Sequence, residues 1–241
     1  MTTLVVGANG ATGRLLVEQL LTQGEVVKII VRSADALPDQ LKQNDQLIVT
    51  EASLLDMTDK ALVAQVQGCR AVVSCLGHNL TFNGMFGHPR RLVTDAVQRL
   101  CLAIEITKPE VPVKFILMNT TGNVNKQAQE TISKRQSLVL TLIRHLVSPH
   151  ADNEKAAAYL QANIDRHQKL IEWTSVRPDS LIDQASVTEY EVYASPTRSA
   201  IFDAGKTSRI NVAHFMSQLI VDDSKWREWE GQMPVIYNAD S

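Results

Sequence analysis

The sequence predicts an α/β fold with a doubly wound, mostly parallel sheet flanked by helices. Short apolar runs rich in β-branched residues alternate with longer segments of helical periodicity along most of the 241 residues. The apolar runs are continuous rather than alternating, as in strands that helices cover on both faces. A glycine-rich loop also stands between the first apolar run and the first helical segment. Together these features predict a Rossmann fold with a small substrate-side extension at its C-terminal end.

The predicted elements follow one another in βα order. The predicted strands, dominated by Val, Ile and Leu, are Leu4–Gly7, Val26–Val31, Leu47–Val49, Ala71–Cys75, Val113–Met118, Trp173–Arg177 and a final Pro234–Tyr237. Helices are predicted over residues 11–22, 59–66, 90–106, 127–146, 153–170 and 211–221. Prolines 38, 109, 112, 149 and 178 fall between these elements, where a missing N–H breaks no ladder or helix bond.

Composition and charge exclude several classes of protein. The 24 Lys and Arg residues nearly balance the 26 Asp and Glu residues, and neither half of the chain is basic, so nucleic-acid binding is not expected. With 44% hydrophobic and 21% charged residues, the composition is that of an ordinary globular protein. Disordered, collagen-like and disulfide-scaffold proteins are therefore excluded.

The same simple features predict where the protein works. The longest apolar runs fall short of the ~20 residues that span a bilayer, so no membrane segment is expected. The N-terminus lacks the basic start of a secretory signal. Cys69, Cys75 and Cys101 cannot all pair and have no metal-ligand spacing, which favours a reducing, cytoplasmic location and no metal. Because no linker or repeat divides the chain, residues 1–241 are predicted to form a single Rossmann domain.

The strongest functional signal is the glycine-rich loop G-x-x-G-x-x-G at residues 7–13. Gly7 permits the tight turn, Gly10 lets the backbone approach a pyrophosphate, and Gly13 permits close packing of the helix that follows. The helix N-terminus then faces the phosphates. The residues predicted to hold the cofactor here are Gly7, Asn9, Gly10, Ala11, Thr12, Gly13 and Arg14. In the alternative reading, the glycines only serve a tight strand-to-helix turn.

The end of the second strand predicts the choice of cofactor. A carboxylate at this point would bind the ribose hydroxyls of NAD, but the sequence has Val31, Arg32 and Ser33. The planar guanidinium of Arg32 can pair with a 2′-phosphate, and Ser33 can add a hydroxyl and an N–H. NADP is therefore favoured over NAD, with Arg14 as a further cation. The alternative is that Arg32 is simply a solvated loop residue.

These motifs resemble a known family. The segments GANGATGR, IIVRS, a strand ending in CLG, VRPDSL and SRINVAHFM are similar to those of the atypical short-chain dehydrogenase/reductase superfamily. The resemblance is closest to its NmrA-like and flavin-reductase-like members. It runs almost end to end, with gaps around 123–150 and 185–205. It implies an NADP-dependent fold and says little about the substrate.

The resemblance extends the predicted cofactor site. It places Ser53 and Leu54 beside the adenine, with Ser53 where relatives carry an Asp, and it places Pro178 beside the nicotinamide carboxamide. The loop after the fourth strand, against the riboses, is formed by Cys75, Leu76 and Gly77. Two interpretations of Cys75 are open: it is a redox group, or it is a small buried residue. Arg177 before the proline can equally form a salt bridge across the sheet.

The catalytic residues that the resemblance implies are incomplete. Relatives end the fifth strand in a Ser or Thr that orients the substrate, and here Asn119, Thr120 and Thr121 occupy that place. Relatives then carry Tyr-x-x-x-Lys, in which the lysine fixes the nicotinamide ribose of the cofactor and lowers the pKa of the tyrosine that acts as general acid. Lys155 matches the lysine, but Ala151 stands where the tyrosine would be. His150 and Tyr159 are candidates to replace the missing tyrosine. In the alternative interpretation, His150 is a loop residue and Tyr159 is a core residue.

The missing tyrosine affects which reaction is expected. Carbonyl reduction needs a proton delivered to oxygen, whereas reduction of a flavin or quinone can take its proton from solvent. Downstream, Tyr190, Tyr193, Arg198 and Phe202 lie where relatives cover the substrate cleft, and they would suit a planar or anionic substrate or serve packing. His214 is expected to be structural or solvated. Residues 226–231 (WREWEG) are expected to pack in the core or to form a dimer contact.

Three functions compete. The first is an NADP-dependent oxidoreductase that transfers hydride from NADPH to a small, planar acceptor of the flavin, quinone or carbonyl class. The second is an NmrA-like dinucleotide sensor without turnover, which the missing tyrosine favours. The third is an extended epimerase-like enzyme, for which 241 residues leave little room. A small-molecule substrate is the expected partner, and the chain is expected to be a monomer or a homodimer.

Overall fold

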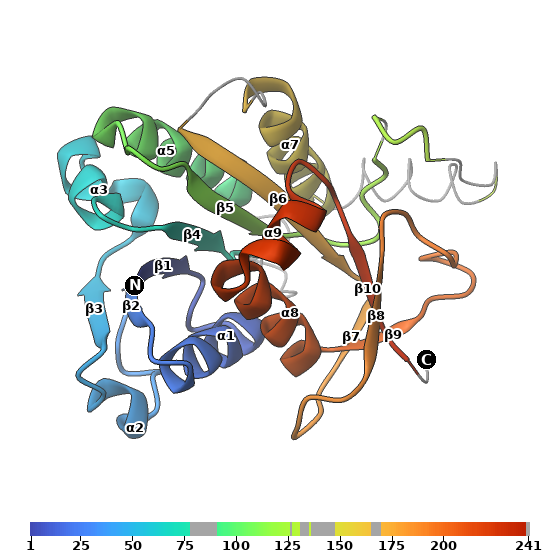
Figure 1. Ribbon diagram of the computed structural model, residues 1–241, viewed down its shortest axis with the longest axis horizontal. Coiled ribbons are helices and arrows are strands. Elements are labelled where there is room, and N and C mark those ends of the chain that lie inside the picture. The colour runs from blue at the N-terminus through green and yellow to red at the C-terminus, as the bar shows by residue number, and fades with distance from the viewer. Residues whose placement is uncertain (78–90, 126, 131–134, 136–147, 165–169, 240–241) are drawn as a thin grey trace.

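The computed structural model describes residues 1–77, 91–125, 127–130, 135, 148–164 and 170–239. An eight-stranded sheet runs through it in the order β3-β2-β1-β4-β5-β6-β10-β8 (Figure 1). The strands are β1 (Thr2–Val6), β2 (Val26–Val31), β3 (Leu47–Glu51), β4 (Ala71–Ser74), β5 (Val113–Met118), β6 (Ile171–Pro178), β8 (Tyr190–Tyr193) and β10 (Val235–Asn238). Only β8 in this sheet is antiparallel to its neighbour, which is β10. The predicted doubly wound, mostly parallel Rossmann sheet is confirmed.

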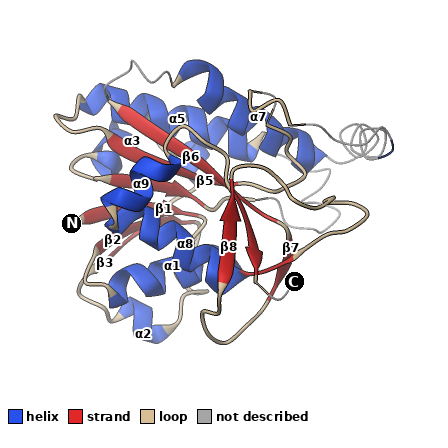
Figure 2. Cartoon of the chain, turned by 45° about the vertical axis from the view of Figure 1, so that its right-hand side comes forward, coloured by secondary structure: helices blue, strands red, loops and turns tan. Residues whose placement is uncertain are grey.

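The helices of the described residues lie on the two faces of this sheet. They are α1 (Ala11–Thr22), α2 (Asp39–Lys42), α3 (Asp59–Val66), α5 (Leu92–Thr107), α7 (Ser148–Asn163), α8 (Arg209–Val221) and α9 (Asp223–Trp229). In Figure 2, α3, α5 and α7 lie on one side of the strands, with α1 and α8 on the other. A short 3₁₀ turn spans Leu54–Asp56, and a separate two-stranded sheet pairs β7 (Ser180–Ile182) with β9 (Lys206–Ser208).

The continuous apolar runs are explained by two separate cores. Alternate residues of one strand point into different cores: Leu4 and Val6 pack with α3, α5 and α7, whereas Val5 packs with α1 and α8. All three are essentially fully buried. Because both faces of the strand are covered by helices, polar residues are not needed at alternate positions.

The strand order reverses between β1 and β4, because β2 and β3 extend the sheet one way and β5 and β6 the other. In doubly wound sheets, ligands bind at such a reversal, outside the carboxyl ends of the strands. The loops that follow β1, β2, β4, β5 and β6 all leave the sheet at this edge. The fold therefore gathers the predicted site residues along one edge of the sheet.

Several predicted boundaries need correction. The helix expected over 153–170 begins at Ser148 and ends at Asn163, with residues 165–169 outside the described part. Pro149 was expected to lie between elements, but it lies in the first turn of α7, where its missing N–H breaks no helical bond. Residues 127–129, expected to be helical, form a turn, and most of the helix expected over 127–146 lies outside the described residues. The third strand also extends to Glu51.

The C-terminal region is more ordered than the sequence predicts. Its expected helix and final strand are present as α8 and β10, but β7, β8, β9 and α9 were not predicted. Trp226 and Trp229 of α9 are buried against the α1 and α8 side of the sheet, which matches the packing alternative. No helix in the described ranges has the length and apolarity to cross a membrane. In the same ranges, no group of three His, Cys, Asp or Glu residues is arranged to hold a metal ion.

Candidate functional site

The glycine-rich loop joins the end of β1 to the start of α1 through contacts that only glycine permits. Gly7 has a φ of +82°, and a Cβ built on it would lie 2.5 Å from the carbonyl carbon and oxygen of Cys75. A Cβ on Gly13 would collide with the carbonyl oxygen of Gly7. The loop therefore lies directly against the end of β4, and α1 lies directly against the loop.

Gly10 leaves the front of this loop open. It is exposed, and a Cβ built on it would meet only the Gly7 oxygen, at 3.2 Å, among the described atoms. As the N-cap of α1, Gly10 gives no side-chain hydrogen bond to the helix, and the first turn of α1 contains no acidic residue. The N–H groups of this turn lie at an exposed helix N-terminus, where an anion is favoured. The pyrophosphate of a dinucleotide fits this arrangement.

Arg32 lies at the carboxyl end of β2, as predicted. Its side chain is exposed and has no hydrogen bond or ion pair with any residue that the structure describes. Arg14, on the first turn of α1, is half-buried, and its guanidinium likewise has no partner within the described ranges. Asn9 ties the two elements together, because its side-chain amide donates to the Ser33 carbonyl at 2.8 Å. The glycine-rich loop and the end of β2 are thus held side by side.

Ser33 has a neighbour that sequence reasoning missed. Its hydroxyl donates to the Asp35 carboxylate at 3.0 Å and accepts the Asp35 N–H at 3.0 Å. The predicted hydroxyl donor is therefore already occupied, and a carboxylate lies close to it. The acidic residue stands only two positions beyond Ser33, so a wider search of this loop would have found it.

The loop predicted to contact the adenine is held in place by Arg99 of α5. The Arg99 guanidinium donates to the carbonyl oxygens of Leu54, Leu55 and Met57 at 2.9, 2.7 and 2.5 Å. Ser53 is half-buried at the start of this turn, and Leu54 is buried. Arg99 of α5 thus fixes the backbone of the predicted adenine loop through its carbonyl groups.

The loop after β4 begins beside Gly7. The Cys75 N–H donates to the Val6 carbonyl at 2.9 Å, which continues the sheet to this point. Burial raises the pKa of the Cys75 thiol to about 12, so the thiol stays protonated at neutral pH. Cys75 is half-buried and packs against the core beside α1 and α8, which favours a packing role over a redox role. Leu76 is half-buried and Gly77 exposed, and residues 78–90 lie outside the described part.

The loop after β5 is fastened to α7 and β6. Asn119 is buried, and its amide donates to the Asn153 carbonyl at 3.0 Å while its side-chain oxygen accepts the Thr120 N–H at 2.9 Å. The Thr121 N–H donates to the Pro178 carbonyl at 3.1 Å. Asn119 therefore has an internal structural role, whereas Thr120 and Thr121 are presented beside the end of β6.

His150 is brought to this loop, but Lys155 is not. The His150 Cε1 atom lies 3.0 Å from the position of a Cβ on Gly122, and the Thr120 hydroxyl lies 3.8 Å from the same point. His150 Nε2 also lies 3.4 Å from the Glu154 carboxylate. Lys155 is exposed, and no hydrogen bond or ion pair links it to the described part of the chain.

The orientation of α7 explains this difference. Asp152 is buried and accepts the N–H groups of Val93 and Thr94 at 2.8 and 3.0 Å, which caps the start of α5. The buried face of α7 is formed by Asp152, Ala156, Ala157 and Leu160, and Lys155 lies off this face and is exposed. Tyr159 packs against the core of α3, α5 and α7, as its structural alternative predicts.

Arg177, before Pro178, has a structural role. It is fully buried, and its guanidinium forms a bidentate ion pair with Glu130 at 2.6 and 2.9 Å. Its other donors reach the carbonyls of Met233 at 2.7 Å, Asn123 at 2.8 Å and Ala194 at 3.3 Å. Arg177 thus clamps the segment after β5 against β6 and β10, which matches the salt-bridge alternative.

Asp179, directly after Pro178, was not singled out from the sequence. It is buried, with 9% of its surface exposed, and it accepts the Gly205 N–H at 3.0 Å. The Thr121 side chain also hydrogen-bonds the carboxyl, and burial raises the pKa of this group above its usual value. A buried carboxyl therefore lies at the meeting point of the loops after β5 and β6.

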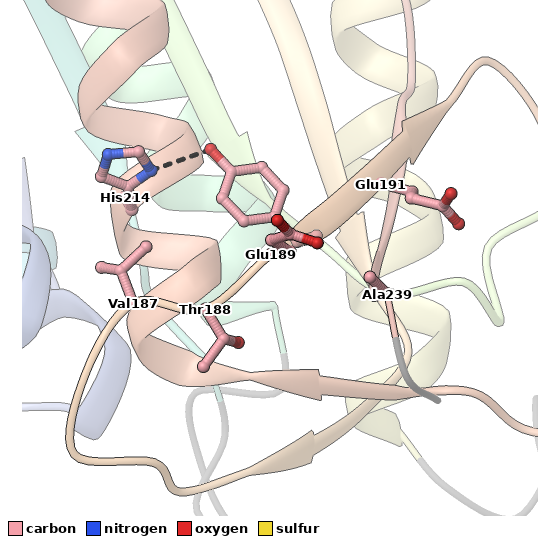
Figure 3. A pocket seen from close by; sticks show the side chains of 7 residues that line it. Val187, Thr188, Glu189, Glu191, His214 and Ala239 are labelled. Atoms are coloured by element: carbon pink, nitrogen blue, oxygen red, sulfur yellow. Dashed lines mark hydrogen bonds between the residues drawn. The ribbon is translucent and has the colours of Figure 1, made fainter.

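The aromatic residues expected to cover the substrate cleft diverge. The Tyr190 hydroxyl bonds His214 Nδ1 at 2.8 Å, beside a shallow hollow lined by Val187, Thr188, Glu189, Glu191 and Ala239 (Figure 3). Tyr193 donates instead to Glu191 at 2.7 Å. Arg198 pairs with Asp203 at 2.9 Å, and Phe202 is 60% exposed. This hollow contains no residue of the predicted cofactor site, and His214 has a structural partner, as expected.

A mostly parallel sheet with a glycine-rich loop between β1 and α1 defines a Rossmann-type dinucleotide-binding protein. Residues 7–223 match the family model described as NAD(P)H-binding. Since the match spans most of the chain, the chain belongs to this NAD(P)H-binding family. No curated protein sequence matches it.

Solved structures with the same fold cover nearly the whole chain. An oxidoreductase from Lactococcus lactis is 17% identical, with a TM-score of 0.68, over 99% of this chain and 91% of that one. A short-chain dehydrogenase/reductase from Veillonella parvula in complex with NADP is 15% identical, with a TM-score of 0.70, over 99% and 94%. An anaerobilin reductase from Escherichia coli is 17% identical, with a TM-score of 0.67, over 100% and 98%. The predicted fold is confirmed, and the predicted family resemblance is confirmed as far as membership of the NAD(P)H-binding family.

Proposed function

We propose that the protein is an NADPH-dependent oxidoreductase that reduces a small, planar acceptor of the flavin, quinone or carbonyl class. One observation carries the proposal: the uncapped, acid-free N-terminus of α1 lies beside an arginine, Arg32, that no described residue engages. The helix terminus suits the pyrophosphate, and the free guanidinium suits a further phosphate on the adenosine ribose. Membership of the NAD(P)H-binding family supports the same cofactor class.

The preference for NADP over NAD rests on charge at the end of β2. Arg32 and Arg14 are both cations without an ion-pair partner in the described ranges, and a 2′-phosphate would provide one. Asp35 opposes this preference through its carboxylate, although the carboxylate is held by the Ser33 hydroxyl and lies in an exposed loop. Two arginines against one exposed carboxylate leave a positive balance at this edge.

The chain's own residues can bind the cofactor and orient the acceptor. NADPH, when bound, supplies the hydride. The loops after β5 and β6 are fixed to each other by the Thr121 N–H and the Pro178 carbonyl, so they provide a rigid wall beside the predicted nicotinamide position. His150 and Thr120 provide polar groups on that wall. The similar anaerobilin reductase and NADP-bound dehydrogenase are consistent with a reductase of this kind.

A dinucleotide sensor without turnover is the second candidate. Ala151 occupies the place of the expected tyrosine. Lys155 is exposed, and no contact with a described residue holds its side chain toward the predicted nicotinamide ribose. A sensor needs the phosphate loop and Arg32 but neither of these catalytic groups. The two candidates therefore differ in turnover and agree on binding.

The test is whether the purified protein oxidises NADPH with a panel of quinones, flavins and aldehydes. The reaction is followed by the loss of absorbance of the reduced cofactor. The oxidoreductase predicts saturable turnover with at least one class of acceptor. Binding of NADPH without turnover of any acceptor would favour the sensor. A Gly10→Val variant, which places a side chain at the front of the loop, is expected to abolish turnover and binding together.

A further inference from the structure

The buried carboxyl of Asp179 has unusual surroundings for an acidic residue. Its side chain receives the Gly205 N–H at 3.0 Å and hydrogen-bonds the Thr121 side chain. Its own N–H donates to the Thr207 hydroxyl at 3.3 Å. Only 9% of the residue is exposed. Backbone and hydroxyl groups, rather than a cation, therefore surround this carboxyl.

The contrast with a neighbouring acid is informative. Glu130 is also buried, but it is matched by the bidentate guanidinium of Arg177. The cation that interacts electrostatically with Asp179 is Arg198. Arg198 already forms an ion pair with the exposed Asp203 at 2.9 Å. Burial raises the pKa of the Asp179 carboxyl, and the hydrogen bonds from Gly205, Thr121 and Ser180 and the charge of Arg198 offset only part of this rise, so its pKa lies above the usual value. Tyr237, another titratable group that faces Asp179, is neutral at physiological pH like any ordinary tyrosine, and burial raises its pKa further.

Asp179 lies where a proton is needed. The Thr121 backbone bonds the Pro178 carbonyl at 3.1 Å, so Thr121 and Asp179 belong to the two loops that meet at the carboxyl edge of β5 and β6. The proposed function puts the acceptor at this edge, and the chain has Ala151 in place of a tyrosine acid. The Thr121 side chain hydrogen-bonds the Asp179 carboxyl, and Thr121 itself belongs to the loop at that edge.

We infer that Asp179 is the proton store of the reaction and acts through the Thr121 hydroxyl on an acceptor with a conjugated carbonyl group. The inference rests on the proposed function and names its substrate class. The carbonyl carbon gains the hydride and its two electrons from NADPH, which becomes NADP⁺. The carbonyl oxygen gains the hydroxyl proton of Thr121, Thr121 takes the proton of Asp179, and solvent returns a proton to the Asp179 carboxylate. Asp179 is a positioning residue and Thr121 the group at the acceptor.

The first experiment compares Asp179→Asn with Asp183→Asn, a matched control in which an exposed carboxylate four residues downstream is neutralised. With a conjugated carbonyl acceptor, Asp179→Asn is expected to lower kcat by about 10²-fold and leave the Kd for NADPH unchanged, as expected for a lost acid. The wild-type kcat is expected to fall as pH rises through the Asp179 pKa, and this fall should be absent in the variant. Asp183→Asn should keep both the wild-type kcat and its pH profile.

A second set of variants tests the link through the hydroxyl. Thr121→Val removes the hydroxyl and is expected to reproduce the loss of kcat, whereas Thr121→Ser keeps a hydroxyl and is expected to restore most of it. Full activity of Thr121→Val would overturn the relay. This pair keeps the inference testable if Asp179→Asn does not fold.

A third measurement needs neither cofactor nor activity. Because the pKa of Asp179 is raised in the folded state, the native protein binds more protons than the unfolded chain between the unfolded and folded pKa values. The stability that the protonated carboxyl contributes is present at low pH and is lost as pH rises through the folded pKa. Asp179→Asn should therefore gain thermal stability relative to wild type as pH rises, and Asp183→Asn should not.

The outcomes separate the two claims. A wild-type protein that turns over an acceptor while Asp179→Asn keeps its kcat and pH profile would overturn the role of Asp179 and leave the proposed function standing. A pH-independent difference in melting temperature between wild type and Asp179→Asn would overturn it as well. A wild type without turnover of any acceptor overturns the proposed function, and the proton store with it.

Discussion

Arg177 and Arg32 have opposite surroundings, which assign them different roles. Arg177 is fully buried and all of its donors are satisfied by Glu130 and by main-chain carbonyls. Arg32 is exposed at the end of β2 and engages none of the residues described. A saturated guanidinium has no donor left for a ligand, so Arg177 holds the fold while Arg32 can bind an anion.

The role of Arg177 predicts a large loss of stability on substitution. Arg177→Met removes the partner of the buried Glu130 and is expected to lower the free energy of unfolding by about 3–5 kcal/mol, because a buried charge is left unpaired. Urea denaturation of the variant measures this loss. Arg198→Met, which breaks an exposed ion pair with Asp203, is the control and should cost less than about 1 kcal/mol. Equal losses in the two variants would contradict the clamp.

At the scale of elements, the contact between α1, the glycine-rich loop and β4 positions the predicted phosphate site. Gly7 lies against Cys75 at the end of β4, and Gly13 lies against the Gly7 carbonyl. α1 also packs against α8, with Gln19 donating to the Ile210 carbonyl at 3.1 Å. The contacts of Gly7 and Gly13 fix the N-terminus of α1, and the contact of Gln19 with α8 fixes the helix further along, so the first-turn N–H groups are pre-organised.

A substitution at Gly13 tests this arrangement. Gly13→Ala places a methyl group against the Gly7 carbonyl and is expected to destabilise the protein by about 1–3 kcal/mol, because neither backbone segment can move freely. The variant should also lose affinity for NADPH, since α1 must shift. Gly77→Ala, where a Cβ meets nothing described within 4 Å, is the control for stability and should unfold close to wild type. Thermal unfolding and fluorescence titration measure the two effects.

Long, apolar elements could be predicted from the sequence, and short polar ones could not. The strands β1, β2, β4 and β5 are mostly apolar because helices cover both faces, and this pattern is visible locally. The strands β7 and β9, of sequence SLI and KTS, carry too few apolar residues to give a pattern. They exist because they pair across a long loop, which is a property of the whole chain.

The residues of the candidate site also divide into those that the sequence predicts and those that only the structure reveals. The glycine-rich loop and Arg32 could be located because both follow a strand at a fixed place in the fold. The pairing of Arg177 with Glu130 spans 47 residues, and the contact of Asp179 with Gly205 spans 26. No spacing rule joins such positions. Lys155 was predicted from its motif, but the packing of Asp152, Ala156, Ala157 and Leu160 against the core determines that Lys155 lies on the exposed face of α7.

At the scale of the whole molecule, cofactor binding should stabilise the fold. The predicted site draws on loops after β1, β2, β4, β5 and β6, so a bound dinucleotide would connect both halves of the sheet. At a concentration of 100 times its Kd, NADPH should stabilise the protein by about 2.7 kcal/mol, which raises the melting temperature of a chain of this size by roughly 5–10 °C. Thermal scans with increasing NADPH measure the shift. A melting temperature that does not respond to NADPH at any concentration would contradict binding to the native state.

The most direct test of the account is a fluorescence titration of NADPH and NADH against wild type and Arg32→Ala. Wild type is expected to bind NADPH more tightly than NADH, because only NADPH carries the 2′-phosphate that Arg32 can pair with. Arg32→Ala should lose most of this preference and keep its affinity for NADH. Tighter binding of NADH by wild type, or an Arg32→Ala variant with an unchanged preference for NADPH, would contradict the account.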